Sequence, residues 1–399
     1  MNNVKKTLKI YLDNNATTPI HPEVIREMEN ALEFTYGNPS TLYSIGKEAK
    51  AKLEEARTRV ASIIGAKSEE IVFTGGGTEA NNLAIFGICK AYRNKGNHII
   101  TSKIEHDSVW NTCKSLERDG IDITYLPVDS YGMVDPEELK KAIRPDTIII
   151  SIMHSNNETG TIQPVNDMAR IAKDGGIPFH TDAVQSIGKI KVNVEDLGVN
   201  LLSIASHKIY GPKGIGALYI RKGTRIQPIL FGGHQEKGYR PGTENVPGIV
   251  GFGKAAEIAD KNIETEGLAF LRDHLYNALK EKIERIRLNG HPTKRLPNTL
   301  NVSIEFVEGE GMVLALDDLG ISVGTGSACA TATLEPSYVL AAMGVPPQIA
   351  HCTLRFSLGR DTTDGDIDYI IEVMPEMVKK MRGFSPLYKE YLRRRKETV

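Results

Sequence analysis

Apolar and polar positions divide the chain into two alternating patterns. Short, almost continuously apolar runs predict buried strands, and apolar residues three and four positions apart predict helices. Strands are expected near residues 70–74, 98–102, 123–127, 147–154, 177–181 and 201–205, with Gly216–Arg221 as an antiparallel partner of the last. Helical stretches lie between them, for example from Ser44 to Ile64. This alternation predicts a mostly parallel α/β sheet covered by helices on both faces.

The pattern changes in the last third of the chain. A long amphipathic stretch from about Val246 to Arg287, with a break near 265–267, leads into a region with fewer strands. There, strands are expected at 299–304 and 353–358, and helices at about 309–319, 336–343 and 363–381, which indicates a smaller α+β domain.

The length of the chain, 399 residues, exceeds what one ordinary core organises. We therefore expect an N-terminal segment, 1–20, that packs with the small domain, a large domain, 21–262, and the small domain itself, 263–399.

Composition narrows the classes of protein. The formal net charge of −1 lacks the basic excess that binding to nucleic acids or anionic membranes needs. No run approaches the ~20 apolar residues of a membrane span, and no signal-type apolar stretch follows Met1. None of the four cysteines has CxxC spacing, which argues against a zinc site or a disulfide framework. We expect a soluble, cytoplasmic protein.

Polar side chains stand where the predicted strands of the large domain end. In parallel α/β sheets, ligands bind outside the carboxyl ends of the strands. Each residue alone has an ordinary explanation, such as a helix cap for Asp182 or a loop histidine for His106, but six at equivalent positions favour a site. They are Thr78, His106, Asn157, Asp182, Gln185 and Lys208.

Lys208 is the most informative of the six. The apolar run at 201–204 ends in Ser206, His207 and Lys208, just before a break at Gly211 and Pro212. A lysine at the end of a buried strand suits a depressed pKa, a Schiff base or a phosphate contact, although a lysine reaching the surface is the ordinary alternative. Three glycines, 75–77, precede a helix and add a weak anion-site signal.

The small domain contains a second candidate group. Cys329 stands among small residues, Gly-Thr-Gly-Ser-Ala-Cys-Ala, whereas Cys89 lies on an apolar helical pattern. A thiol on such a loop is typical of a reactive cysteine, and the other three cysteines are expected to be structural. The glycine-rich stretch 231–245 is expected to be an ordered functional loop.

These features together resemble the cysteine desulfurases of the NifS/IscS-like type, which are pyridoxal-phosphate enzymes of the class V aminotransferase superfamily. The resemblance runs from Tyr11 to Tyr388 and is carried by motifs at 77–82, 154–158, 180–185, 207–216, 240–245, 326–329 and 354–360. It implies the fold type I architecture of pyridoxal-phosphate transferases, with a seven-stranded-type sheet in the large domain and the catalytic cysteine loop in the small domain.

The resemblance also implies a role for each candidate in holding pyridoxal 5′-phosphate. Lys208 would form the Schiff base and move protons, Asp182 would pair with the pyridinium nitrogen, and Gln185 would contact the phenolic oxygen. His106 would stack on the ring and assist proton transfer. The phosphate would be held by Gly77, Thr78, Ser206 and His207, together with Thr243 from a partner subunit, which implies a homodimer.

The same resemblance assigns the substrate and the sulfur. Asn157 and Arg355 would orient L-cysteine, with Arg355 binding its carboxylate. The Cys329 thiolate would take the sulfur, leaving L-alanine and a persulfide. The sulfur would then pass to an iron–sulfur scaffold protein or another acceptor. No metal site is expected, apart from Cys329 as a transient ligand of an iron–sulfur cluster.

One position departs from the family pattern. The family usually has serine three residues before the Schiff-base lysine, where this chain has Ala205, and Ser206 follows instead. One phosphate hydroxyl is therefore expected to be missing or supplied differently.

Three other functions remain open from the sequence. An ordinary class V aminotransferase would not need Cys329, and a selenocysteine lyase would prefer selenocysteine. A catalytically idle docking subunit would lack the cofactor.

Overall fold

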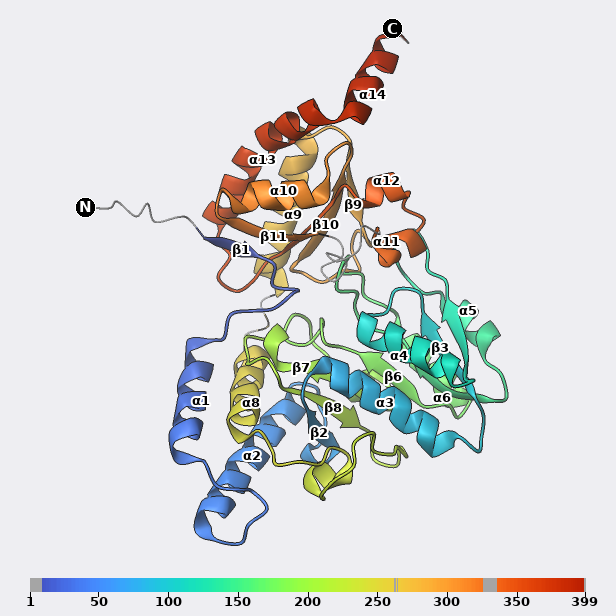
Figure 1. The fold of residues 1–399 in the computed structure, drawn as a ribbon, viewed down its shortest axis with the longest axis vertical. Coiled ribbons are helices and arrows are strands. Elements are labelled where there is room, and N and C mark those ends of the chain that lie inside the picture. The colour runs from blue at the N-terminus through green and yellow to red at the C-terminus, as the bar shows by residue number, and fades with distance from the viewer. Residues whose placement is uncertain (1–8, 262, 264, 326–335, 398–399) are drawn as a thin grey trace, which may run out of the picture.

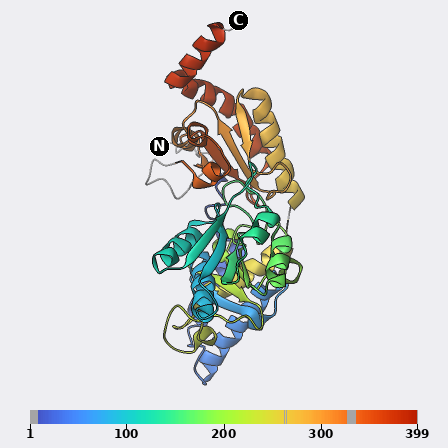
Figure 2. The same ribbon diagram turned by 90° about the vertical axis from the view of Figure 1, so that its right-hand side faces the viewer.

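The computed structural model describes residues 9–261, 263, 265–325 and 336–397. Two sheets organise these residues. Figure 1 shows the five-stranded sheet and its helices above the seven-stranded sheet, with the C-terminal helix α14 (Pro386–Glu397) projecting from the far end. The view at right angles shows the same elongated arrangement (Figure 2). The Cys329 loop, 326–335, lies outside the described residues.

The seven-stranded sheet forms the centre of the larger part. Its order is β2 (Ile71–Thr74), β8 (Gly216–Ile220), β7 (Leu201–Ala205), β6 (Phe179–Asp182), β5 (Thr147–Ser151), β3 (His98–Ser102) and β4 (Asp122–Leu126). Only β8 runs antiparallel to its neighbours. The predicted mostly parallel sheet is therefore confirmed, and so is the antiparallel partner of the Lys208 strand.

Helices cover both faces of this sheet. Neighbouring strand residues divide between two apolar clusters: Ile99 packs with α3 (Gly77–Tyr92) and α4 (Asp107–Arg118), and Ile100 packs on the opposite face. That opposite face is covered by α1 (Pro22–Phe34), α2 (Ser44–Ser62), α5 (Pro136–Ala142), α6 (Val165–Asp174), α7 (Val194–Leu197) and α8 (Val246–Lys261). Burial on both faces explains why these strands read as continuous apolar runs.

The five-stranded sheet has the order β1 (Ile10–Leu12), β11 (Ile321–Thr325), β12 (Thr353–Ser357), β10 (Thr299–Ile304) and β9 (Ile286–Asn289). β1 pairs parallel to β11, and the other pairs are antiparallel. After β1, the chain crosses to the larger part, where α1 and α2 lie (Figure 1). The division at 262/263 stays a prediction.

One face of the five-stranded sheet is apolar and the other is polar. Leu300 and Val302 pack against α9 (Thr265–Lys282), α10 (Gly309–Asp317) and α13 (Asp364–Phe384). The intervening Asn301 and Ser303 are buried polar residues, as is Arg355 between Leu354 and Phe356. Because side chains alternate along a strand, this pattern points Arg355 away from the small core. Two short helices, α11 (Tyr338–Ala342) and α12 (Pro347–Ala350), complete this part.

Several elements differ from the predictions. The long helical stretch ends at Lys282, and Ile286–Asn289 forms β9, so the predicted extension to Arg287 is wrong. The strand expected over 147–154 ends at Ser151. Residues 321–325, for which no strand was predicted, form β11, which pairs with β1 and β12.

Candidate functional site

A cavity of about 350 Å³ lies at the carboxyl ends of the parallel strands. It is lined by all six predicted strand-end residues, Thr78, His106, Asn157, Asp182, Gln185 and Lys208, and also by Gly77, His207 and Arg355. The topology brings them together because each follows a parallel strand or lies on the facing sheet. The structure thus gathers most of the predicted site residues around one space.

Lys208 enters the cavity from a short 3₁₀ turn, Ser206–Lys208, that directly follows β7. Its Nζ donates hydrogen bonds to the backbone oxygens of Asn15, at 2.5 Å, and Ala16, at 2.8 Å. The amine is therefore held on the cavity wall by the N-terminal segment.

Asp182 is the last residue of β6, and its side chain is almost completely buried. Its Oδ1 accepts a hydrogen bond from the backbone N–H of Val184 at 3.0 Å, as a turn cap would. Its Oδ2 accepts one from Asn81 Nδ2 at 2.7 Å, and Asn81 also donates to Ser108 Oγ at 2.8 Å. Two fixed donors thus hold the carboxylate in one orientation at the cavity.

His106 caps the N-terminus of α4. Its Nδ1 accepts the backbone N–H of Ser108 at 3.1 Å and lies 2.8 Å from the Ser108 hydroxyl. Because Nδ1 is an acceptor here, a neutral His106 ring carries its proton on Nε2. The capping role and the place on the cavity wall are thus compatible.

The glycine loop places the first turn of α3 beside the cavity. Gly76 is the N-cap, with φ +152°, a conformation that L-residues rarely adopt. A Cβ on Gly77 would lie 2.8 Å from Val184 Cγ2, so the close approach also requires glycine there. The free N–H groups and the dipole of this turn suit an anion such as a phosphate.

A second hollow of about 800 Å³ adjoins this turn and is lined by Gly75–Gly77, Thr78, His207 and Lys213. Burial, together with the positive charges of Lys208, Lys213 and Lys189, lowers the pKa of His207 to about 4. A neutral imidazole at physiological pH can donate one hydrogen bond to an anion without carrying a charge.

Ser206, a predicted phosphate ligand on the same chain, does not line the cavity. Its Oγ is buried and has no hydrogen-bond partner among the described residues, and it faces Gly211. Ala205 lines the cavity instead. The backbone at Ala205 is extended, so the side chains of residues 205 and 206 point to opposite sides. The Ser206 hydroxyl therefore cannot take the place of a hydroxyl at position 205.

Thr243 lies on the exposed part of the 231–245 loop and lines neither space in its own chain. Its predicted contribution to a partner's site stays a prediction.

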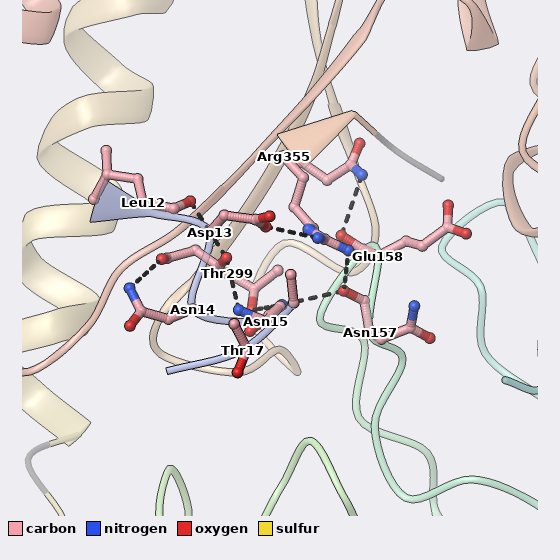
Figure 3. Close-up of polar contacts among 12 residues, drawn as sticks. Leu12, Asp13, Asn14, Asn15, Thr17, Asn157, Glu158, Thr299 and Arg355 are labelled. Atoms are coloured by element: carbon pink, nitrogen blue, oxygen red, sulfur yellow. Dashed lines mark hydrogen bonds and ion pairs between the residues drawn. The ribbon is translucent and has the colours of Figure 1, made fainter. Parts of the chain in front are cut away.

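Arg355 reaches the cavity from β12 and is about 1% exposed. Its Nη2 pairs with Asp13 Oδ1 at 2.7 Å, and its Nη1 donates to the backbone oxygen of Asn157 at 3.2 Å (Figure 3). Its buried Nε has no hydrogen-bond partner among the described residues. The two contacts to Asp13 and Asn157 thus hold the guanidinium at the cavity wall.

The N-terminal segment 13–18 contributes residues that sequence reasoning missed. The backbone oxygen of Asn15 accepts hydrogen bonds from Gln185 Nε2, at 3.0 Å, and from Lys208. Figure 3 shows Asn15 beside Thr299, where Asn15 Nδ2 donates to Thr299 Oγ1 at 2.9 Å. The available signal was the polar run after a short strand. Lys189, which contacts Asn15 and Gln185, carried no comparable signal.

Two buried acids surround the site. Burial raises the pKa of Glu105 to about 8 and that of Glu158 to about 7. Glu105 Oε1 accepts the Met153 N–H at 3.0 Å, and Glu158 Oε2 accepts Ser337 Oγ at 2.5 Å. These acids fix the loops beside the cavity.

The groups around the cavity fit pyridoxal phosphate. The glycine turn suits its phosphate, Lys208 its aldehyde carbon, and the Asp182 carboxylate its protonated ring nitrogen. Asn81 and Arg355 also line the cavity, and their buried Oδ1 and Nε atoms have no hydrogen-bond partner among the described residues.

A mostly parallel sheet with a lysine, an aspartate and a glycine turn at its carboxyl edge defines a pyridoxal-phosphate enzyme of fold type I. The family model for class V aminotransferases matches residues 10–370. The chain belongs to this family, whose members depend on pyridoxal phosphate.

Its relatives are more specific. The chain is 52% identical to a cysteine desulfurase IscS of Dictyoglomus turgidum, over 96% of this chain and 98% of that protein. It is 54% identical to a cysteine desulfurase IscS of Methanosarcina thermophila, over 96% and 95%. A solved NifS-like protein superposes with a TM-score of 0.88 at 39% identity, covering 93% of this chain and all of the other. The predicted family and fold are confirmed.

Within the described residues, no helix combines the length and apolar character that crossing a membrane requires.

Proposed function

We propose that this chain is a cysteine desulfurase that uses pyridoxal phosphate to convert L-cysteine to L-alanine and a persulfide on Cys329. The observation that carries the proposal is the joint placement of Lys208, Asp182 and Arg355 on one cavity of about 350 Å³. A carboxylate-binding arginine beside a cofactor lysine suits an α-amino acid substrate, and the desulfurase names of the relatives specify which one.

Substrate binding would begin at Arg355. Its Nε and the groups now bound to Asp13 and Asn157 give a planar set of donors that matches a carboxylate. The Asn157 side chain also lines the cavity and would orient the substrate.

Proton transfers fall to Lys208 and His106. When bound, the cofactor withdraws electrons from the substrate's α-carbon and thereby labilises its bonds. Asp182, with both oxygens fixed by Asn81 and Val184, would keep the ring nitrogen protonated. The Lys208 amine and the Nε2–H of His106 would carry protons to and from the substrate.

The sulfur step would use Cys329, which lies outside the described residues. Gly324 pairs directly with Arg355 in the β11–β12 ladder, so the chain that leads toward Cys329 starts beside the proposed carboxylate site. The thiolate would attack the substrate sulfur and form an S–S bond. The C–S bond breaks, its electron pair stays on carbon and takes up a proton, and alanine leaves.

The partners remain part of the proposal. We propose a homodimer in which Thr243 completes the partner's phosphate site. An iron–sulfur scaffold or another acceptor would receive the sulfur, with Cys329 as a possible transient cluster ligand. A cytoplasmic location is proposed with it.

The test is the release of sulfide and alanine from L-cysteine by the purified protein in the presence of a thiol reductant. We expect equal amounts from the wild type and a loss of at least ~100-fold in Cys329→Ala, which retains the yellow cofactor. Cys352→Ala serves as the matched control because Cys352 packs at the start of β12 away from the cavity.

Three outcomes would contradict the proposal. Unchanged turnover with an amino-group acceptor in Cys329→Ala would favour an aminotransferase. A strong preference for selenocysteine would favour a selenocysteine lyase, and a wild type without cofactor absorbance would favour a docking subunit.

A further inference from the structure

Lys189 is a lysine behind the cavity wall that the proposed chemistry does not use. It lies in the turns that follow β6, four residues after Gln185. The residue as a whole is partly exposed, but its amine end is enclosed by protein. Burying an amine costs free energy, so its place here calls for a compensating role.

The amine makes two contacts, and both reach the cavity wall. Nζ donates to Gln185 Oε1 at 2.7 Å and to Asn15 Oδ1 at 2.9 Å. Gln185 belongs to the larger part of the chain, whereas Asn15 follows strand β1 of the five-stranded sheet. One amine therefore joins the two parts at the site.

These contacts fix the orientation of the Gln185 amide. With Oε1 bound to Lys189, the amide nitrogen faces Asn15, whose backbone oxygen accepts it at 3.0 Å. An amide nitrogen has two N–H groups, and the second is left for the cavity that Gln185 lines. Without a donor at Oε1, the amide could turn and present its oxygen instead.

The amine remains a donor at any pH. Burial and then the charges of Lys208 and Arg355 lower its pKa well below the ordinary value. A neutral amine has two N–H groups, which equals the number of acceptors that Lys189 meets.

We propose that Lys189 is a positioning residue that holds Gln185 and Asn15 so that the Gln185 amide presents an N–H to the cofactor. The inference rests on the proposed function, since it concerns how the same site binds pyridoxal phosphate. Lys189 also lines a separate cavity of about 480 Å³, called here the Lys189 cavity, which leaves space for substitutions at this position.

The experiment is a double-mutant cycle on cofactor affinity. Apoproteins of the wild type, Lys189→Met, Gln185→Leu and the double variant are titrated with pyridoxal phosphate, and the dissociation constants are measured by equilibrium dialysis. We expect Lys189→Met to raise the dissociation constant about tenfold, the loss of roughly one hydrogen bond. In the Gln185→Leu background the same substitution should have little effect.

Two matched variants separate positioning from structural support. Lys254→Met removes another lysine that lines the Lys189 cavity and pairs with Glu23 at 3.1 Å. This variant should leave the affinity for pyridoxal phosphate unchanged. Lys189→Arg keeps N–H donors and should retain most of the affinity. The unfolding midpoint of apo Lys189→Met should change little, because the removal of a buried amine offsets the loss of its hydrogen bonds to Gln185 and Asn15.

The inference is overturned if Lys189→Met binds the cofactor like the wild type, or if its effect has the same size in both backgrounds. Lys189→Ala, which also removes the donor, replaces it in the cycle if the methionine variant does not fold. A wild type that itself fails to bind pyridoxal phosphate would overturn the proposed function and this inference together, whereas normal wild-type binding with no effect at Lys189 would overturn the inference alone.

Discussion

At the scale of single residues, positions 205 and 206 show how strand geometry decides which side chain can bind a ligand. Ala205 lines the cavity, and the Ser206 hydroxyl is buried on the opposite side against Gly211. The family resemblance suggested Ser206 as a phosphate ligand, and the direction of its hydroxyl argues against that role.

This difference gives a prediction for cofactor affinity. Ser206→Ala should leave the dissociation constant of pyridoxal phosphate within about twofold of the wild type, because the hydroxyl does not face the site. Ala205→Ser should lower it by roughly fivefold, since it adds one hydrogen-bond donor to the phosphate cradle. Equilibrium dialysis of the apoproteins measures both, and a weaker-binding Ser206→Ala would contradict the assignment.

Sequence reasoning found the residues that directly follow apolar strands and missed those that depend on distant contacts. Lys208 and Asp182 were predicted because each ends a recognisable strand. Asn81 was not assigned a role of its own, because its contact with Asp182 joins positions about 100 residues apart. Asp13 reaches Arg355 across an even longer separation, which no local pattern encodes.

At the scale of elements, a buried ion pair fastens the 231–245 loop to the large sheet. The Glu236 carboxylate accepts hydrogen bonds from both terminal nitrogens of Arg57, at 2.6 and 2.7 Å, and from the backbone N–H of Phe73 at 2.7 Å. The Arg57 side chain is 7% exposed and the Glu236 side chain is 3% exposed. Glu236 and Lys237 have φ of +45° and +60°, so the pair holds a strained turn on the loop that carries Thr243.

Arg57→Ala should therefore destabilise the protein by about 3–5 kcal/mol, because the Glu236 carboxylate would stay buried without its partner. Arg59→Ala is the control on the same helix. Arg59 pairs with Glu55 near the surface and should contribute no more than about 1 kcal/mol. Denaturant unfolding measures both, and equal losses would show that burial does not govern the pair.

The two strands that were not predicted from the sequence, β9 and β11, belong to the five-stranded sheet. β9 has four residues directly after a helix, and β11 contains serine and glycine, so neither shows a clear strand pattern. Both exist because neighbouring strands supply their hydrogen bonds. The large sheet was predictable because its strands are apolar on both faces.

At the scale of the whole molecule, stability should depend on pH through Glu158. Burial raises its pKa to about 7, above the value of 4.5 expected for an unfolded chain. Between these values the folded protein holds a proton that the unfolded chain releases. This contribution to stability is therefore complete below about pH 4.5 and is lost as the pH rises toward 7.

Glu158→Gln should remove that part of the pH dependence. Relative to the wild type, the free energy of unfolding of the variant should rise by at most about 1.4 kcal/mol per pH unit between pH 5 and 7. Above pH 7 the difference between the two proteins should stay constant. Glu281→Gln, at an exposed position on α9, should follow the wild-type curve. A constant difference between Glu158→Gln and the wild type across the range would contradict this assignment.

The pairing of β1 with β11 also has a consequence for synthesis on the ribosome. Ile10 lies beside Ile321, about 310 positions later, so the first strand leaves the ribosome long before its partner exists. At 5–20 residues per second, the delay is on the order of 15–60 s. During this time Asn15 can meet Gln185 and Lys208, but Thr299, which it also contacts, has not yet been synthesised. The cavity wall that Arg355 supplies is therefore completed only after most of the polypeptide has been translated.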